Sequence, residues 1–143
     1  MKTRRTRQLA TIHEIVATAH DHPTAEQVCD RARRRVPRIS LGTVYRNLQK
    51  LEEQQQVRVV HLHDRPTRYD GMLQEHDHFL CERCGMVADL AQSREARPNW
   101  SRLYRAGYRV RAQALTFYGL CPQCRRSEER PSRAGRDSAH QQD

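Results

Sequence analysis

Two Cys-x-x-Cys pairs, Cys81/Cys84 and Cys121/Cys124, are the residues of this chain best suited to bind a metal. A Cys-x-x-Cys turn brings two thiolates within reach of one ion, and two such turns complete the tetrahedral sulfur shell that zinc prefers. The spacing therefore predicts a closed metal site with a structural role. The fifth cysteine, Cys29, lies on the apolar face of a predicted helix and is interpreted as a core residue.

Other metal-binding residue types flank the first cysteine pair. The residues before it read His76-Asp77-His78, and Asp89 follows it. Imidazole and carboxylate ligands suit iron, manganese or zinc in a site more open than a sulfur shell. The sequence thus indicates a second metal site, one that can respond to conditions.

The alternatives to metal binding by the cysteines depend on the redox compartment. Residues 1–7 are basic, but no unbroken apolar segment follows them and no span is long enough to cross a bilayer, so we expect a cytoplasmic protein. In a reducing cytosol, paired cysteines are more often metal ligands than disulfides. A thioredoxin-like role would need one pair to open a helix after a core strand, which neither pair clearly does.

Length and charge narrow the function further. A chain of 143 residues can bury one modest core or two very small ones, and small units often need a metal or a partner subunit for stability. Twenty-six Lys and Arg against seventeen Asp and Glu give a formal charge of +9, which favours a polyanionic partner such as nucleic acid.

The N-terminal half has the periodicity of a winged helix-turn-helix. Its segments are three helices at 6–20, 25–36 and 41–54 and two strands at 57–62 and 67–69. Thr24 and Ser40 are good caps for the second and third helices. The basic face of an amphipathic helix is usually only solvated. Here the context favours DNA binding, because the segments match the geometry that enters a major groove: a short helix, a turn, a third helix with a polar outer face and an arginine-bearing wing.

The third helix and the wing supply the candidate DNA contacts. Tyr45 and Arg46 are expected to read bases, and Gly42 would let the helix start approach a phosphate closely. The predicted DNA-binding residues are Thr43, Tyr45, Arg46, Lys50, Arg58 and Arg68. Of these, Lys50, Arg58 and Arg68 are expected to contact phosphates.

The C-terminal half carries the metal ligands on short elements. Strands are predicted at 79–80, 87–90 and 108–118 and a helix at 95–106, and a strand edge of this kind favours pairing with a second chain. We therefore predict an α+β protein, with a winged-helix DNA-binding domain at 1–69, a metal-binding dimerisation domain at 70–125 and a disordered tail at 126–143.

Five motifs between His22 and Cys124 together resemble the ferric uptake regulator (Fur) family of metal-dependent, dimeric transcription repressors. The motifs are His22-Pro-Thr-Ala, Gly42-Thr-Val-Tyr-Arg-Asn-Leu48, Arg68-Tyr-Asp70, His76-x-His-x-x-x-x-Cys-x-x-Cys84 and Tyr118-Gly-x-Cys-x-x-Cys124. Their order and spacing are hard to obtain by accident.

The resemblance assigns two metal sites. It implies structural zinc on Cys81, Cys84, Cys121 and Cys124. It also implies regulatory iron or manganese on His22, Asp70, His76, His78 and Asp89. Because those five ligands come from both domains and the hinge, the metal can be fully bound in only one relative orientation of the domains. The implied partners are operator DNA and a second copy of the chain. Ala112 and Gln113 stand where some members carry a histidine of a further site, so we expect two sites per chain.

The signal is a finer question within the resemblance. Aspartate at both 70 and 89 resembles the peroxide-responsive (PerR) branch, in which bound iron reacts with peroxide and a ligand histidine is oxidised, here His22 or His76. The alternatives are an iron- or manganese-responsive uptake regulator without peroxide sensing, whose recognition-helix pattern Arg46 follows, and a zinc-responsive regulator. The chain begins late relative to many members, so we expect their leading helix to be shortened or absent.

Two other function classes are alternatives to a repressor. A non-haem iron enzyme would need a substrate pocket, and the sequence contains no Gly-rich loop, nucleophile motif or second catalytic cluster. A zinc-binding interaction or metal-carrier protein would not need the winged-helix half. The sequence therefore favours a regulator that is not an enzyme.

Overall fold

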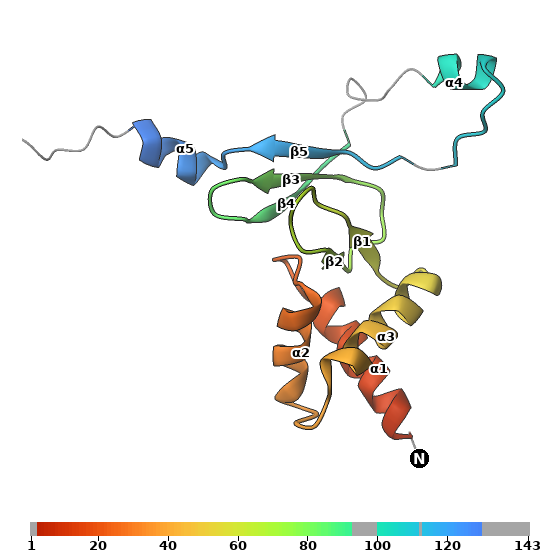
Figure 1. Ribbon diagram of the computed structural model, residues 1–143, viewed down its shortest axis with the longest axis vertical. Helices are drawn as coiled ribbons and strands as arrows, with labels where there is room; N and C mark the ends of the chain where they lie inside the picture. Colours follow the sequence, from red (N-terminus) through yellow and green to blue (C-terminus); the bar gives the residue numbers. More distant parts are fainter. Residues whose placement is uncertain (1–2, 93–99, 112, 130–143) are drawn as a thin grey trace, which may run out of the picture.

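The N-terminal helices gather at one end of the molecule, and the short strands lie toward the other end together with the C-terminal helices (Figure 1). The computed structural model describes residues 3–92, 100–111 and 113–129. Its elements are α-helices and two separate sheets, so the predicted α+β class is confirmed. No helix within these described ranges is long and apolar enough to cross a membrane.

The three N-terminal helices pack around one apolar core. They are α1 (Arg4–Ala17), α2 (Ala25–Arg33) and α3 (Leu41–Glu53). Thr24 and Ser40 cap α2 and α3, each accepting a hydrogen bond from a backbone N–H in the first turn. The apolar stripes that the sequence shows on each helix meet in this core, where Ile12, Val28 and Leu48 are fully buried.

A two-stranded wing follows the bundle. Its strands are β1 (Arg58–Val60) and β2 (Arg68–Asp70), which pair antiparallel with Val59 opposite Tyr69. Three helices and this hairpin give the winged-helix arrangement that the sequence predicts. β1 is shorter than the run predicted at 57–62, because only Arg58–Val60 pair with β2, and β2 lies one residue later than the run predicted at 67–69.

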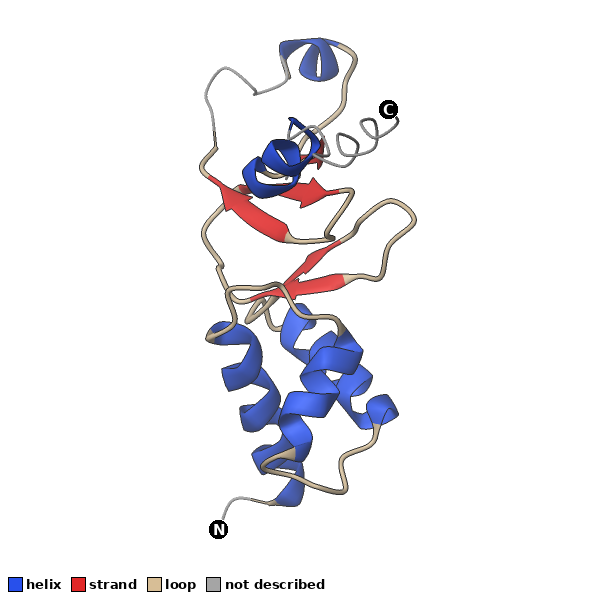
Figure 2. Cartoon of the chain, turned by 90° about the vertical axis from the view of Figure 1, so that its left-hand side faces the viewer, coloured by secondary structure: helices blue, strands red, loops and turns tan. Residues whose placement is uncertain are grey.

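The wing lies between two cores (Figure 2). Val57 belongs to the core of the helical bundle. Val60 and Leu62 instead form a second core with Leu80 and Val87 of the C-terminal half. The wing therefore holds the helical bundle and the second sheet against each other.

The second sheet places both cysteine pairs at one end. It consists of β3 (Asp77–Cys81) between β4 (Val87–Leu90) and β5 (Thr116–Gly119), with β4 antiparallel and β5 parallel to β3. The register puts Gly119 beside Cys81, so the chain leaves β5 toward Cys121 next to the point where β3 ends. The two cysteine turns thus meet although 40 residues separate Cys81 from Cys121.

Several predicted bounds are wrong. The first helix begins at Arg4, because Thr3 caps it by accepting a hydrogen bond from the Thr6 N–H, and it ends at Ala17 rather than at residue 20. The strand predicted over 108–118 is confined to β5, whose pairing with β3 begins at Thr116. The helix predicted over 95–106 appears as α4 (Ser101–Arg105), and residues 95–99 lie outside the described part of the chain.

A further helix, α5 (Pro122–Glu129), follows the second cysteine pair and runs into the segment predicted to be a disordered tail. Proline suits the first turn of a helix, and Cys121 accepts a hydrogen bond from the Arg125 N–H. The second pair therefore does open a helix after a strand, contrary to the expectation from sequence. Residues 130–143 lie outside the described ranges.

Candidate metal centre and nucleic-acid interface

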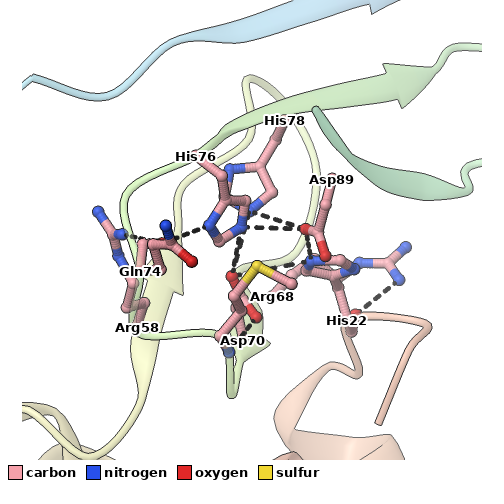
Figure 3. A network of polar contacts seen from close by, with 9 residues as sticks. His22, Arg58, Arg68, Asp70, Gln74, His76, His78 and Asp89 are labelled. Atoms are coloured by element: carbon pink, nitrogen blue, oxygen red, sulfur yellow. Dashed lines mark hydrogen bonds and ion pairs between the residues drawn. The ribbon is translucent and has the colours of Figure 1, made fainter. Parts of the chain in front are cut away.

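Three histidines and two aspartates converge between the helical bundle and the second sheet (Figure 3). The structure brings together all five residues that the resemblance implied, and one ligand atom from each lies within 4.8 Å of the others: His22, Asp70, His76, His78 and Asp89. Four of the five side chains are buried, and Asp89 is the one partly open to solvent.

Each ligand is supplied by a different local structure. His22 lies in the loop between α1 and α2 with a left-handed backbone (φ 47°), a conformation that is uncommon outside glycine. Asp70 ends β2 and Asp89 lies in β4, directly across from His78 of β3. Backbone strain of this kind at a cluster of polar side chains is typical of functional sites.

Two carboxylate oxygens are the centre of the cluster. Nε2 of His76 lies 2.8 Å from Oδ2 of Asp70 and 3.0 Å from Oδ1 of Asp89. The same Asp89 oxygen lies 2.7 Å from Nε2 of His22. Nε2 of His78 lies 3.3 Å from Asp70 Oδ2. These contacts connect the helical bundle to the second sheet through polar atoms alone.

The hydrogen bonds of His76 prepare it to bind a cation. Its Nδ1 donates to the Gln74 carbonyl oxygen at 2.7 Å, and a carbonyl only accepts, so this nitrogen carries the proton. Nε2 therefore faces the cluster as the nitrogen available to a metal ion, and Nε2 of His78 lies 3.0 Å away. Lone pairs and carboxylate oxygens converging in this way fit a bound metal ion.

The Asp70 carboxyl is held in its charged form. Burial raises its pKa, but hydrogen bonds from His78 and from the Met72 N–H, with smaller contributions from the nearby imidazoles of His22 and His76, outweigh burial and leave the pKa below its ordinary value. An ionised carboxylate is the form that binds a metal. With imidazole nitrogens beside it, this donor set suits Fe(II) or Mn(II).

The four predicted zinc ligands, Cys81, Cys84, Cys121 and Cys124, also converge within 4.8 Å of one another. The backbone N–H groups of Cys84 and Cys121 donate to the Cys81 sulfur and lower its pKa to about 6. Burial raises the pKa of Cys124 to about 12. Four sulfurs gathered around one point suit structural zinc and replace the thioredoxin-like alternative, which uses a single pair.

One arginine joins the two cysteine turns. Arg83, between Cys81 and Cys84, donates to the Cys124 carbonyl oxygen at 3.2 Å and pairs with Glu128 of α5. This side chain holds the helix that follows the second pair against the turn of the first. No local pattern indicates this contact, because 45 residues separate Arg83 from Glu128.

The outer face of α3 carries part of the predicted DNA contacts. Thr43, Arg46 and Lys50 line an open groove of about 750 Å³, which Arg4 and Arg5 of α1 close from the other side. The basic run at the N-terminus could have indicated these two arginines, which the predicted DNA contacts omit. A groove with four cations on its walls favours a polyanion.

Tyr45 and Arg46 are oriented by neighbours. The Tyr45 hydroxyl donates to a Glu26 carboxylate oxygen of α2 at 3.0 Å, and this bond raises the pKa of Tyr45. Nη2 of Arg46 donates to Thr43 Oγ1 at 3.0 Å. Both side chains remain exposed, so neither contact removes them from the surface.

The two wing arginines expected to contact phosphates are engaged inside the chain. Nη1 of Arg58 donates to the Gln74 carbonyl oxygen at 3.0 Å. Arg68 donates to the carbonyl oxygens of His22 and Gly85 at 3.1 and 3.2 Å. In this conformation the wing arginines point at the hinge around the His/Asp cluster.

A glycine beside the cluster was missed by sequence reasoning. A Cβ added to Gly71 would lie 2.5 Å from Ala17 Cα and 2.7 Å from the Val16 carbonyl oxygen. Gly71 therefore lets the chain pass against the end of α1 directly after Asp70. A single sequence contains no sign of this close approach, because it depends on tertiary packing.

Residues 1–118 match the family model described as the ferric uptake regulator family. In Bacillus subtilis (strain 168), the peroxide operon regulator is 29% identical over 86% of this chain and 85% of its own length. The ferric uptake regulation protein of the same strain is 31% identical and covers 83% of each chain. Among solved structures, the Campylobacter jejuni peroxide stress regulator is 29% identical with a TM-score of 0.70, covering 85% of this chain and 91% of that chain. Because the identity to a peroxide regulator and to a ferric uptake regulator is nearly equal, the overall similarity does not distinguish a peroxide signal from an iron signal.

Proposed function

The chain belongs to the ferric uptake regulator family, and we propose that it is a dimeric, metal-dependent repressor that leaves its operator when peroxide oxidises a ligand histidine. One observation supports this most: three histidines and two aspartates from both halves of the chain converge within 4.8 Å. A site shared between the helical bundle and the second sheet makes metal occupancy control the orientation of α3.

The metal switch depends on which half supplies each ligand. His22 and Asp70 are attached to the helical bundle and the wing, whereas His76, His78 and Asp89 belong to the second half. Without a cation, two buried or half-buried carboxylates and three imidazoles repel or compete for protons. A divalent cation removes that conflict only while the two halves stay docked. DNA-competent geometry is therefore the metal-bound geometry.

The proposal of peroxide as the signal rests on the carboxylates. Both are aspartates, which reach less far than glutamates and leave a His/carboxylate iron site more open to a small oxidant. Bound Fe(II) would supply the activation of peroxide. The overall change inserts one peroxide oxygen into a C–H bond of an imidazole and releases the other oxygen as water. His22 and His76 are the proposed targets, because each lies 3.0 Å or less from Asp89 Oδ1.

An iron- or manganese-responsive uptake regulator is the second candidate. The similarity to a ferric uptake regulation protein supports it, and so does Arg46 on the recognition helix. A zinc-responsive regulator fits less well, because zinc responders would favour a thiolate in the open site and this cluster has none among its five ligands. Both proposals describe a regulator rather than an enzyme, and both place it in the cytoplasm with the DNA.

DNA binding is proposed to use α3 in the major groove. Tyr45 and Arg46 would read base edges, with Thr43 and Lys50 at the flanking backbone. Arg4 and Arg5 face the same groove and are added to the phosphate contacts. Arg58 and Arg68 are left out, because their guanidinium groups donate to backbone carbonyls of the hinge.

A second copy of the chain is the proposed partner of the C-terminal half. Large apolar side chains are exposed there, including Tyr104, Tyr108, Phe117 and Tyr118. Exposed apolar side chains in such number are typical of an interface. Two recognition helices in one dimer would then contact two half-sites of an operator.

The direct test measures operator binding by the zinc-loaded protein with Mn(II), with Fe(II), and after a small dose of peroxide. We expect both metals to support binding and peroxide to abolish it only for the Fe(II) form, with one oxygen added to His22 or His76 by mass spectrometry. Asp89→Glu should keep metal-dependent binding and weaken the peroxide response. An Fe(II)-loaded protein that stays on DNA with unmodified histidines would leave iron or manganese sensing as the function.

A further inference from the structure

Arg68 connects the two candidate metal sites. Its Nη1 donates to the carbonyl oxygen of His22, and its Nη2 donates to the carbonyl oxygen of Gly85, the residue directly after Cys84. Figure 3 shows the guanidinium beside the His22 loop. One side chain of the wing thus bridges the loop that carries a regulatory ligand and the turn that carries two zinc ligands.

Both carbonyls belong to backbone segments with unusual conformations. His22 and Gly85 have positive φ angles of 47° and 74°. The Gly85 N–H donates to the Cys81 carbonyl oxygen at 2.8 Å, so the Gly85 carbonyl moves with the cysteine turn. On the other side, the N–H of Tyr69 donates to the Pro23 carbonyl oxygen at 3.0 Å and ties the strand of Arg68 to the loop of His22.

Other wing contacts reach the second half without touching His22. Nη2 of Arg65 donates to the Glu82 carbonyl oxygen at 2.9 Å, and the His63 N–H donates to the Tyr118 hydroxyl at 3.1 Å. Arg65 therefore contacts the same cysteine turn as Arg68, but within the described part of the chain it makes no hydrogen bond to the His22 loop. This difference makes Arg65 a matched control.

We propose that Arg68 is a positioning residue that couples the cysteine site to the His/Asp site. A planar guanidinium can donate to two carbonyls in a fixed fork, which an ammonium group cannot reproduce. Zinc orders the turn ending in Gly85, Arg68 transmits that order to the His22 backbone, and His22 is thereby aimed at Asp89. The coupling is reciprocal, so metal in the His/Asp site should also raise the affinity of the cysteine site for zinc. This inference rests on the proposed regulatory metal at the His/Asp site.

The test is an equilibrium competition for zinc between the protein and a chelator that binds Mn(II) weakly, with and without Mn(II). In the unmodified protein, Mn(II) should raise the zinc affinity at least about fivefold, the lower end of usual coupling between sites. Arg68→Lys and Arg68→Ala should lose that rise. Arg65→Ala should keep it, even where its zinc affinity without Mn(II) is lower.

Hydrogen exchange of the zinc-loaded protein without Mn(II) gives a second readout. Arg68→Lys should speed exchange at both residues 20–24 and 82–86, whereas Arg65→Ala should speed it at 82–86 alone. The proposal is overturned if Arg68→Lys retains the Mn(II) effect, if Arg65→Ala abolishes it too, or if exchange at 20–24 is unchanged in Arg68→Lys. A failure of the proposed function looks different: Mn(II) would not promote operator binding by the unmodified protein, while the exchange result would still decide the role of Arg68.

Discussion

Nε2 of His22 lies 2.7 Å from Oδ1 of Asp89, although 67 residues separate them in the chain. His22 belongs to the loop between two helices of the bundle, and Asp89 belongs to an edge strand of the second sheet. The pair therefore joins the two halves at the point where a cation would bind. A protein that must change DNA affinity with metal occupancy needs a contact of this kind.

Replacing either partner should weaken Mn(II) binding at the His/Asp site without removing zinc from the cysteine site. We expect His22→Ala and Asp89→Ala each to weaken Mn(II) binding by more than about tenfold, since even loss of a residue supporting a ligand costs that much. Zinc content should be unchanged, because neither substitution removes one of the four cysteines. Mn(II) titration with zinc analysis checks this. Glu75→Ala is the control, since this exposed carboxylate lies next to His76 but outside the cluster.

Zinc uptake should release fewer than four protons near neutral pH. Four thiols would bind the ion, but the pKa of Cys81 is lowered to about 6, so in the folded protein it is already a thiolate near neutral pH. Below that pKa Cys81 holds its proton, so the number released should rise and zinc affinity should fall more steeply as pH drops. Calorimetry in buffers with different ionisation enthalpies counts the protons. A constant release of four across this range would contradict the lowered pKa.

The same pKa shift predicts a pH dependence of stability in the zinc-free protein. The folded pKa of Cys81 lies below its ordinary value of 9.0. Its contribution to the free energy of unfolding is therefore present above about pH 9 and lost as pH falls through about 6. The contribution of Cys124 to the free energy of unfolding changes with pH in the opposite direction. Its raised pKa means that the folded state favours the thiol, so this contribution is lost as pH rises through about 12. Urea unfolding of chelator-treated protein between about pH 9 and pH 6 should show the loss of stability that Cys81 predicts.

Substitutions on α3 should affect either the preference for operator DNA or the affinity for all DNA, depending on the residue replaced. Arg46→Ala should cost about 1 to 3 kcal/mol at the true operator and much less on random DNA, because it removes a base contact. Lys50→Ala should weaken both DNAs similarly and lower the salt slope by about one. Binding to both DNAs at several salt concentrations measures this. Arg105→Ala removes the same charge from α4, at the far end of the molecule, and should change neither. Equal losses on both DNAs for Arg46→Ala would argue against base readout.

Local signals in the sequence predicted the three helices, the four cysteines and the group of His76, His78 and Asp89, whereas the family resemblance added His22 and Asp70 to that group. Capping residues such as Thr24 and Ser40 mark helix starts, and metal ligands are recognisable from residue type and spacing. The positions of the wing arginines depend instead on tertiary packing. The residues next to Arg68 in the sequence do not distinguish a phosphate contact from a bridge between His22 and Gly85. The polar composition of residues 122–129 likewise does not suggest a helix, although the Arg125 N–H donates to the Cys121 carbonyl oxygen there.

Gly71→Ala should destabilise the fold and weaken the regulatory site together. Its added methyl group would lie 2.5 Å from Ala17 Cα and 2.7 Å from the Val16 carbonyl oxygen, and these backbone atoms cannot move aside as a side chain could. Overpacking of this kind costs about 1 to 3 kcal/mol of unfolding free energy. The chain must shift away from α1 to relieve it, and Asp70 shifts with it, so Mn(II) affinity should fall while zinc stays bound.

Gly42→Ala is the matched control for that substitution. Its added methyl group would meet only the flexible tip of Arg46 at 3.6 Å, and position 42 lies in the first turn of α3. Removing a helical glycine should leave stability unchanged or raise it by up to about 1 kcal/mol. Urea unfolding and Mn(II) titration of both variants make the comparison. If Gly71→Ala matched Gly42→Ala in both measurements, close packing of the hinge against α1 could not be what places Asp70 in the metal site.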